Sequence, residues 1–207
     1  MKKVYIFFLS TPFKTGKTIQ FLTGHKYNHV AFSFEKSGDK LYSYARYRYH
    51  EPFLSGFGIE NTDRYAPQIN DTHIKICEYE VSDEHYRRIR CRIRHYEENR
   101  RKSTYNFLDI LCYPFNIHLK LAYTHTCISF LLELLERRDV HTIGQLERKL
   151  KNNVIYEGCI GDYCEKLTSG TIDFYEKRSL WNVIDETKNR AWLVAFRLLG
   201  FIKKKVL

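Results

Sequence analysis

Cys127 is the residue in this sequence with the clearest capacity for chemistry, because it opens a predicted helix. Thr124 and Thr126 precede it, and a threonine hydroxyl there can cap the free N–H groups of a first turn. Behind it, apolar residues recur at helical spacing. A thiol at a helix N-terminus lies where the dipole favours an anion, and such sites lower its pKa from about 8.5 to about 3.5–7.5. The alternative is a buried structural cysteine, since free cysteine is among the most buried residue types.

His29 is the candidate base for such a thiol. It opens a β-like run, residues 29–34, which a polar turn at 37–40 connects to a second run at 41–45. Nucleophilic cysteine catalysis needs a base within hydrogen-bond reach of sulfur and a third group that orients the base. His29 on one strand, a polar side chain such as Ser43 on the next, and Cys127 on a helix can supply all three. The alternative for a single histidine is a structural role.

The order of these segments resembles the circularly permuted papain-like hydrolases of the NlpC-type superfamily, in which the histidine precedes the cysteine. YiiX-like and YaeF-like bacterial proteins belong to that class. The resemblance covers roughly residues 3–165, and its strongest pieces are Tyr-Asn-His-Val at 27–30 and Thr-Cys-Ile-Ser-Phe at 126–130. It implies that Cys127 is the nucleophile and His29 the base. Ser43 falls where relatives often place a polar orienter such as His, Asn or Glu.

The same resemblance implies a fold and a domain organisation. We expect an α+β domain in the permuted papain-like arrangement, with a small antiparallel sheet packed against helices, over residues 1–168. A C-terminal helical extension with a basic tail would follow over residues 169–207.

The implied function is a cysteine hydrolase, amidase-like or peptidase-like, that cleaves an amide or ester through an acyl-enzyme on Cys127 and needs no cofactor. An acyltransferase or thioesterase on lipid-type substrates is one alternative. A catalytically inactive binding protein of the same fold is another, and a serine at position 43 in place of a stronger orienter favours it.

Composition narrows the range of partners. The chain has 207 residues, 43% of them hydrophobic, which suits a folded domain, and its formal charge of +10 suits an anionic partner. The arginine-rich segment 87–101 lacks the reading element of a known nucleic-acid module, so we expect a solvated helix face there rather than a nucleic-acid site. The partners left are a small-molecule, peptide or lipid-type substrate, an anionic ligand or membrane surface, and a second copy of the chain.

The six cysteines are irregularly spaced, and a chain of this length does not need disulfide bonds, so we predict reduced thiols in a cytoplasmic protein. Cys159 and Cys164 lack the close spacing and nearby histidine of a zinc site, and we expect no metal. A phosphate loop at Gly16-Lys17-Thr18 is not expected, because its upstream glycine is replaced by Thr11.

Periodicity and turn residues predict the remaining elements. We expect strands at 4–9, 73–81 and 152–158, and helices at 14–23, after Ser82, at 105–112 and at 142–150. Residues 46–50 alternate cations and aromatics, which favours an exposed strand face. Pro52, Gly56 and Gly58 indicate a loop.

The C-terminal run 191–202 is apolar almost all round, contains one charge, Arg197, and is followed by Lys203-Lys204-Lys205. A dozen apolar residues are too few to span a bilayer. The run could lie peripherally at an acidic membrane surface. The alternative is a helix docked on the catalytic domain or on a second copy of the chain.

Overall fold

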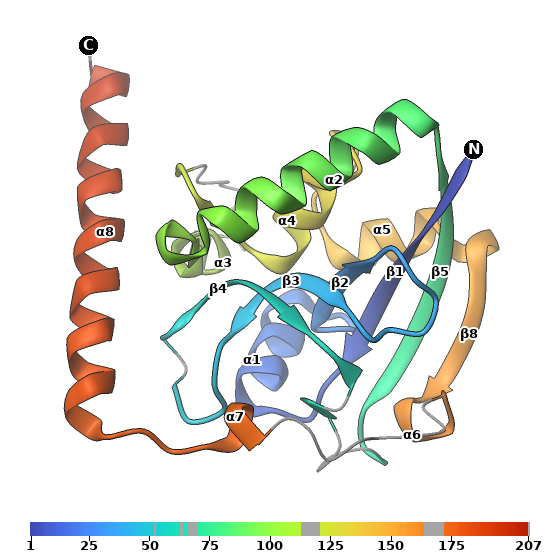
Figure 1. Cartoon of the computed structure of the whole chain (residues 1–207), viewed down its shortest axis with the longest axis horizontal. Coiled ribbons are helices and arrows are strands. Elements are labelled where there is room, and N and C mark those ends of the chain that lie inside the picture. The colour runs from blue at the N-terminus through green and yellow to red at the C-terminus, as the bar shows by residue number, and fades with distance from the viewer. Residues whose placement is uncertain (52, 63, 66–69, 113–120, 164–171, 207) are drawn as a thin grey trace.

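A six-stranded antiparallel sheet runs through the computed structural model (Figure 1), which describes residues 1–51, 53–62, 64–65, 70–112, 121–163 and 172–206. The strand order is β4-β3-β2-β1-β5-β8. Its strands are β1 (Lys2–Ser10), β2 (His29–Ser33), β3 (Leu41–Arg46), β4 (Ser55–Glu60), β5 (His73–Val81) and β8 (Val154–Cys159). The short strands β6 (Thr104–Tyr105) and β7 (Thr124–His125) form a separate parallel pair.

Helices cover the sheet, and their combination with an antiparallel sheet confirms the α+β class. The helices are α1 (Lys14–Thr23), α2 (Asp83–Glu98), α3 (Phe107–Cys112), α4 (Cys127–Leu134), α5 (Ile143–Lys149), α6 (Ile160–Tyr163), α7 (Ile172–Tyr175) and α8 (Leu180–Val206). Short 3-10 turns lie at η2 (Arg100–Lys102) and η4 (Lys151–Asn153). In Figure 1, α2, α4 and α5 lie on one side of the sheet.

Strand β1 explains why the sheet is buried on both faces. Val4, Ile6 and Phe8 point into a core shared with α2, α4 and α5, whereas Phe7 and Leu9 point into a second core with α6 and α7. The continuous apolar run 4–9 is typical of such a two-sided strand. Its partner β2 is antiparallel, and the pairing puts His29 opposite Leu9, at the end of the strand.

Most of the predicted elements are confirmed, and three differ. The stretch predicted as a loop around Gly56 and Gly58 contains β4, which pairs with β3 along its whole length. The strand predicted to continue through residues 46–50 ends at Arg46. Tyr105 lies in β6 rather than in a helix, and α3 begins at Phe107.

Four cysteines are free thiols: Cys77, Cys91, Cys127 and Cys159. The side chain of Cys112 and the whole of Cys164 lie outside the described part of the chain.

The C-terminal segment packs on the domain through α7 and continues as a long helix at its edge. Phe174 of α7 lies in the second core and is 5% exposed. Helix α8 follows and stands along one edge of the molecule, with its C-terminal end far from the sheet (Figure 1). No helix within the described residues is long and apolar enough to cross a membrane.

Candidate active site

Cys127 is the first residue of α4, as the sequence predicts. Its cap is Thr126, whose hydroxyl accepts a hydrogen bond from the Ser129 N–H at 3.1 Å. The Ser129 hydroxyl in turn accepts from the Thr126 N–H at 2.9 Å, which completes a reciprocal capping box. The thiol therefore lies at a well-formed helix N-terminus, where unpaired N–H groups and the dipole favour an anion.

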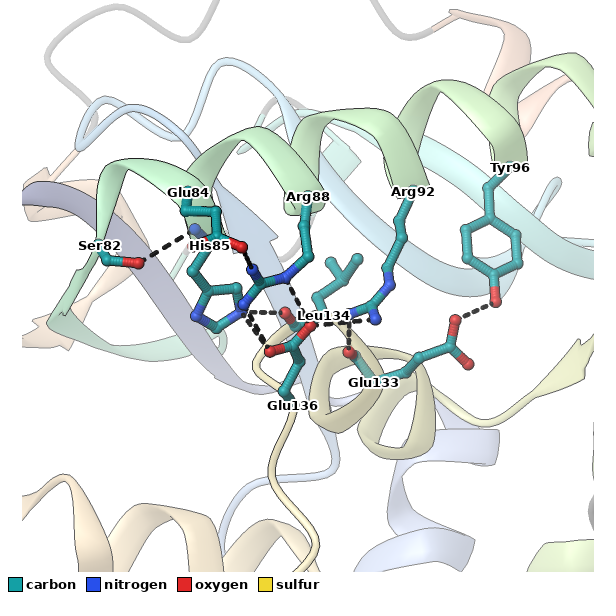
Figure 2. A network of polar contacts seen from close by, with 9 residues as sticks. All are labelled: Ser82, Glu84, His85, Arg88, Arg92, Tyr96, Glu133, Leu134 and Glu136. Carbon is teal, nitrogen blue, oxygen red and sulfur yellow. Dashed lines mark hydrogen bonds and ion pairs between the residues drawn. The ribbon is translucent and has the colours of Figure 1, made fainter.

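The opposite end of α4 is held by α2 (Figure 2). The Glu133 carbonyl accepts from Arg92 Nη1 at 2.8 Å, and the Leu134 carbonyl lies 2.9 Å from His85 Nε2. These contacts satisfy carbonyl groups that a helix C-terminus leaves unpaired. Further side-chain contacts of α2 join Tyr96 to Glu133 of α4, and Arg88 and Arg92 to Glu136, which follows that helix. Helix α2 thus fixes the position of the helix that carries the thiol.

His29 lies beside Cys127, because β2 packs under α4. The imidazole and the thiol lie close enough to shift each other's pKa, and the Val30 backbone also favours the charged form of the sulfur. Ring nitrogen Nε2 faces a carboxylate instead, so Nδ1 is the nitrogen left for the thiol. The base and the nucleophile expected from the sequence are therefore in contact.

The carboxylate that faces His29 belongs to Glu60, the last residue of β4, whose side chain is 2% exposed. Its Oε1 lies 2.7 Å from His29 Nε2. Its Oε2 accepts from Tyr65 Oη at 3.0 Å and pairs with Arg64 Nη1 at 2.9 Å. Both oxygens therefore have partners, as a buried carboxylate requires. The sequence argument did not find Glu60, because its strand was predicted as a loop.

Ser43 is fully buried on β3 and lies next to the site, but its hydroxyl donates to Glu60 Oε1. The same oxygen contacts His29. The structure thus puts Glu60 in the position that the sequence argument gave to Ser43, and Ser43 holds Glu60. A carboxylate stabilises an imidazolium better than a hydroxyl does, because it carries the opposite charge.

The electrostatics of the site favour a thiolate beside an imidazolium. Burial by itself raises the pKa of the Cys127 thiol, but the hydrogen bond and charge of His29 outweigh it and lower that pKa below its ordinary value. Burial would also lower the pKa of His29, yet Glu60 and Cys127 raise it to about 10. Burial opposes ionisation of Glu60 too, but Arg64 and His29 hold its pKa well below the usual range. Each charge in the series is therefore paired with an opposite one.

Tyr105 is a further functional candidate that the sequence argument did not single out. Its hydroxyl lies close enough to the Cys127 sulfur and backbone N–H for both groups to influence its pKa. Burial and the Cys127 charge raise the pKa of Tyr105 well above 10, so the phenol keeps its proton. The ladder between β6 and β7 places it, since Tyr105 pairs with His125, two residues before the thiol.

Two cavities meet at this site. A cleft of about 1430 Å³ is lined by Cys127 and Tyr105 and extends along α4 to α5. A smaller pocket of about 440 Å³ is lined by Tyr105, His29 and Glu60, and most of its remaining wall is apolar. Arg46 also lines the smaller pocket, where its Nη1 donates to the Tyr49 carbonyl at 3.1 Å. The catalytic candidates thus lie where a substrate could enter from either cavity.

Within the described residues, no group of three or more His, Cys, Asp and Glu side chains is arranged to hold a metal ion. Comparison with known proteins found no match to a protein-family model, a curated protein or a solved structure. The functional argument therefore rests on the geometry of the site.

Proposed function

We propose that this protein is a cysteine hydrolase of permuted papain-like architecture that cleaves an amide or ester with a Cys127–His29–Glu60 triad. One observation carries the proposal: the Cys127 thiol and the buried Glu60 carboxylate both interact with the same imidazole, His29, whose Nε2 lies 2.7 Å from Glu60 Oε1. A nucleophile, a base and an orienting group in contact are the signature of nucleophilic catalysis. A purely structural cysteine would not need the other two.

The reaction would proceed in two halves. In the first, the Cys127 thiolate attacks the substrate carbonyl carbon, and the resulting tetrahedral intermediate expels an amine or alcohol that takes the proton from His29. In the second, water gives a proton to neutral His29 and attacks the thioester. Release of the acid restores the thiolate and the imidazolium. Glu60 would stabilise the charged ring throughout.

Two donors would stabilise the negative oxygen of the tetrahedral intermediate. The Cys127 N–H is one, because it lies at the start of α4. Tyr105 is the second candidate, since its protonated hydroxyl contacts both that N–H and the sulfur. A substrate oxygen entering there would take over the N–H and accept the phenol proton as a hydrogen bond. Removing one such donor typically costs about 10²–10³ in kcat.

Acyl transfer or thioester hydrolysis on lipid-type substrates is a second candidate, and the smaller pocket favours it. That pocket is lined by aromatic side chains such as Phe13, Phe53 and Phe107 and lies next to His29. An apolar acyl chain would suit these walls. The alternative of an inactive binding protein loses its main support, because Glu60 supplies the charged orienter that Ser43 could not.

The first experiment maps thiol reactivity. Iodoacetamide at pH 6 should modify Cys127 before Cys91, although Cys91 is exposed and Cys127 is 4% exposed. The reason is that an ordinary thiol of pKa about 8.5 is almost fully protonated at that pH. Peptide mapping by mass spectrometry reads out the order of modification, and urea-unfolded protein, in which the preference should vanish, is the control. Equal rates for Cys91 and Cys127 in the folded protein would remove the catalytic assignment.

The second experiment tests for the acyl-enzyme. p-Nitrophenyl acetate and p-nitrophenyl octanoate should each release nitrophenolate in a burst and add one acyl group to Cys127, visible in the intact mass. Cys127→Ala should show no burst, and an unchanged burst in that variant would contradict the mechanism. Faster acylation by octanoate would favour lipid-type substrates. Adding an amine and measuring amide against acid in ¹⁸O-labelled water would separate transfer from hydrolysis.

A further inference from the structure

Helix α8 exposes an apolar face that no other described element covers. Its strongly exposed apolar side chains are Leu180 (70%), Trp181 (78%), Trp192 (73%), Phe196 (75%) and Leu199 (58%). Trp192, Phe196 and Leu199 follow one another at intervals of four and three, which places them on one side of a helix. A contiguous exposed patch of this kind on a folded protein marks an interaction surface.

The opposite side of α8 is fastened to the domain by two arginines. Arg190 Nη1 donates to the Ser103 carbonyl at 2.9 Å, and its guanidinium lies 4.8 Å from the centre of the Tyr47 ring. Arg197 Nη2 donates to the Lys102 carbonyl at 2.7 Å. These contacts fix which side of the helix faces outward, so the apolar side is presented to the surroundings by the fold itself.

Charge indicates what would cover this face. From residue 187 to the end of the chain there is no acidic residue. The basic residues there are Arg190 and Arg197, which face the domain, and the four lysines Lys188, Lys203, Lys204 and Lys205. The exposed basic turn η2 lies directly against the middle of α8, since its Lys102 carbonyl receives Arg197. Apolar and aromatic side chains flanked by lysines and arginines are the pattern of a helix that lies in the interface of an anionic bilayer.

We propose that α8 is an interfacial anchor that lays Trp192, Phe196 and Leu199 on an anionic membrane surface while the lysines that flank this apolar face contact lipid phosphates. A second copy of the chain is a poorer occupant, because pairing two such helices would bring two cationic segments together. The helix would lie on the bilayer and not cross it, because its apolar run has only about a dozen residues and basic residues flank the run at both ends. This inference is independent of the chemistry proposed for Cys127.

The test uses the full-length protein and its own fluorescence, because both tryptophans of the chain, Trp181 and Trp192, lie on α8. Vesicles of phosphatidylcholine alone are compared with vesicles of equal parts phosphatidylcholine and phosphatidylglycerol. We expect co-sedimentation and a blue shift of tryptophan emission with the anionic vesicles, at least tenfold weaker binding to neutral ones, and weakening by salt. Absence of binding to the anionic vesicles would overturn the proposal.

Two variants locate the surface. The double substitution Trp192→Glu and Phe196→Glu should lower anionic-vesicle binding at least tenfold. The matched control is Phe21→Glu on α1. It replaces an aromatic side chain that is 87% exposed and lies far from α8 in the sequence. It should bind like the unaltered protein.

Melting temperature and the rate of Cys127 alkylation show whether each variant is folded. Equal loss of binding in the control and the α8 variant would refute the assignment to α8. Size-exclusion chromatography with light scattering covers the remaining case. If the α8 variant turned a dimer into a monomer and still bound vesicles, the surface would be a self-association site and the proposal would be wrong.

Discussion

Cys77 and Cys127 are both buried, and both belong to the same hydrophobic core, yet their environments push their thiols in opposite directions. Cys77 is 0% exposed and Cys127 is 4% exposed. Burial raises the pKa of Cys77 to about 12, and nearby Glu147 and Glu157 add to the effect. The pKa of Cys127 is lowered. Burial alone therefore does not make a cysteine inert or reactive.

The difference lies in what faces each sulfur. The Cys77 thiol lies 3.7 Å from the Leu150 carbonyl, an acceptor that favours the protonated thiol. Around Cys127 the groups are donors: the His29 ring, the Val30 N–H and the Tyr105 hydroxyl. Hydrogen bonds to the charged form favour that form. A carbonyl keeps a proton on one sulfur, whereas donors allow the other sulfur to lose it.

The largest effect is expected from Glu60→Ala. It would leave Arg64 and His29 without their buried counter-charge, and removing one member of a buried pair typically costs about 3–5 kcal/mol of stability. Urea unfolding measures the loss, and Glu60→Gln, which keeps the shape, should lose less. A loss as small as that of an exposed acid, such as Glu97→Ala, would contradict the role of Glu60 in the site.

The pH dependence of this effect has a defined sign. The folded pKa of Glu60 is depressed, so its contribution to stability is complete above the ordinary glutamate value of about 4.3 and is lost as pH falls through the lower folded pKa. The stability difference between the unaltered protein and Glu60→Ala should therefore shrink in acid.

His29→Ala should make Cys127 resemble Cys77. Without the imidazolium, the Cys127 thiol loses the partner that outweighs burial, so its iodoacetamide rate at pH 6 should fall by about 100-fold, or about 2.7 kcal/mol. The Cys91 rate in the same sample is the internal control and should not change. A Cys127 rate that stays high would mean that the helix N-terminus and the remaining donors suffice.

Ser43→Ala tests the hydroxyl that holds Glu60. A hydrogen bond to a charged group contributes about 1.5–3 kcal/mol, and the lost donor leaves three partners on the carboxylate. We expect a loss of stability near the lower figure and acylation activity far above that of Cys127→Ser. Complete loss of activity in a variant with a normal melting temperature would give Ser43 a direct role in the reaction.

The smallest effect on the thiol is expected from Tyr105→Phe, which removes one donor and keeps the ring. The Cys127 pKa should rise by at most about one unit, so alkylation at pH 6 should slow by no more than about tenfold. Acylation by p-nitrophenyl acetate should fall further than alkylation, because alkylation forms no oxyanion. Equal losses in the two assays would speak against a role for Tyr105 at the tetrahedral intermediate.

The sequence by itself determined the local parts of the site. Caps, apolar spacing and turn residues act within a few positions, and they predict a helix that starts at Cys127 and a strand that starts at His29. The α+β class, which the resemblance implied, is confirmed by the antiparallel sheet and its covering helices. The permuted papain-like architecture and the catalytic roles rest on a resemblance and stay predictions.

Tertiary structure decided the third member of the site. Gly56 and Gly58 indicate a loop when only residues adjacent in the sequence are considered. The sequence argument therefore missed β4, and with it Glu60. In the fold, a Cβ at Gly56 would lie 2.5 Å from the Ser103 carbonyl oxygen, so the glycine permits close packing of the strand. That contact joins residues 47 positions apart in the chain. The residue pattern within β4 does not reveal the need for a glycine at position 56, because that need comes from Ser103, which only the tertiary fold places beside the strand.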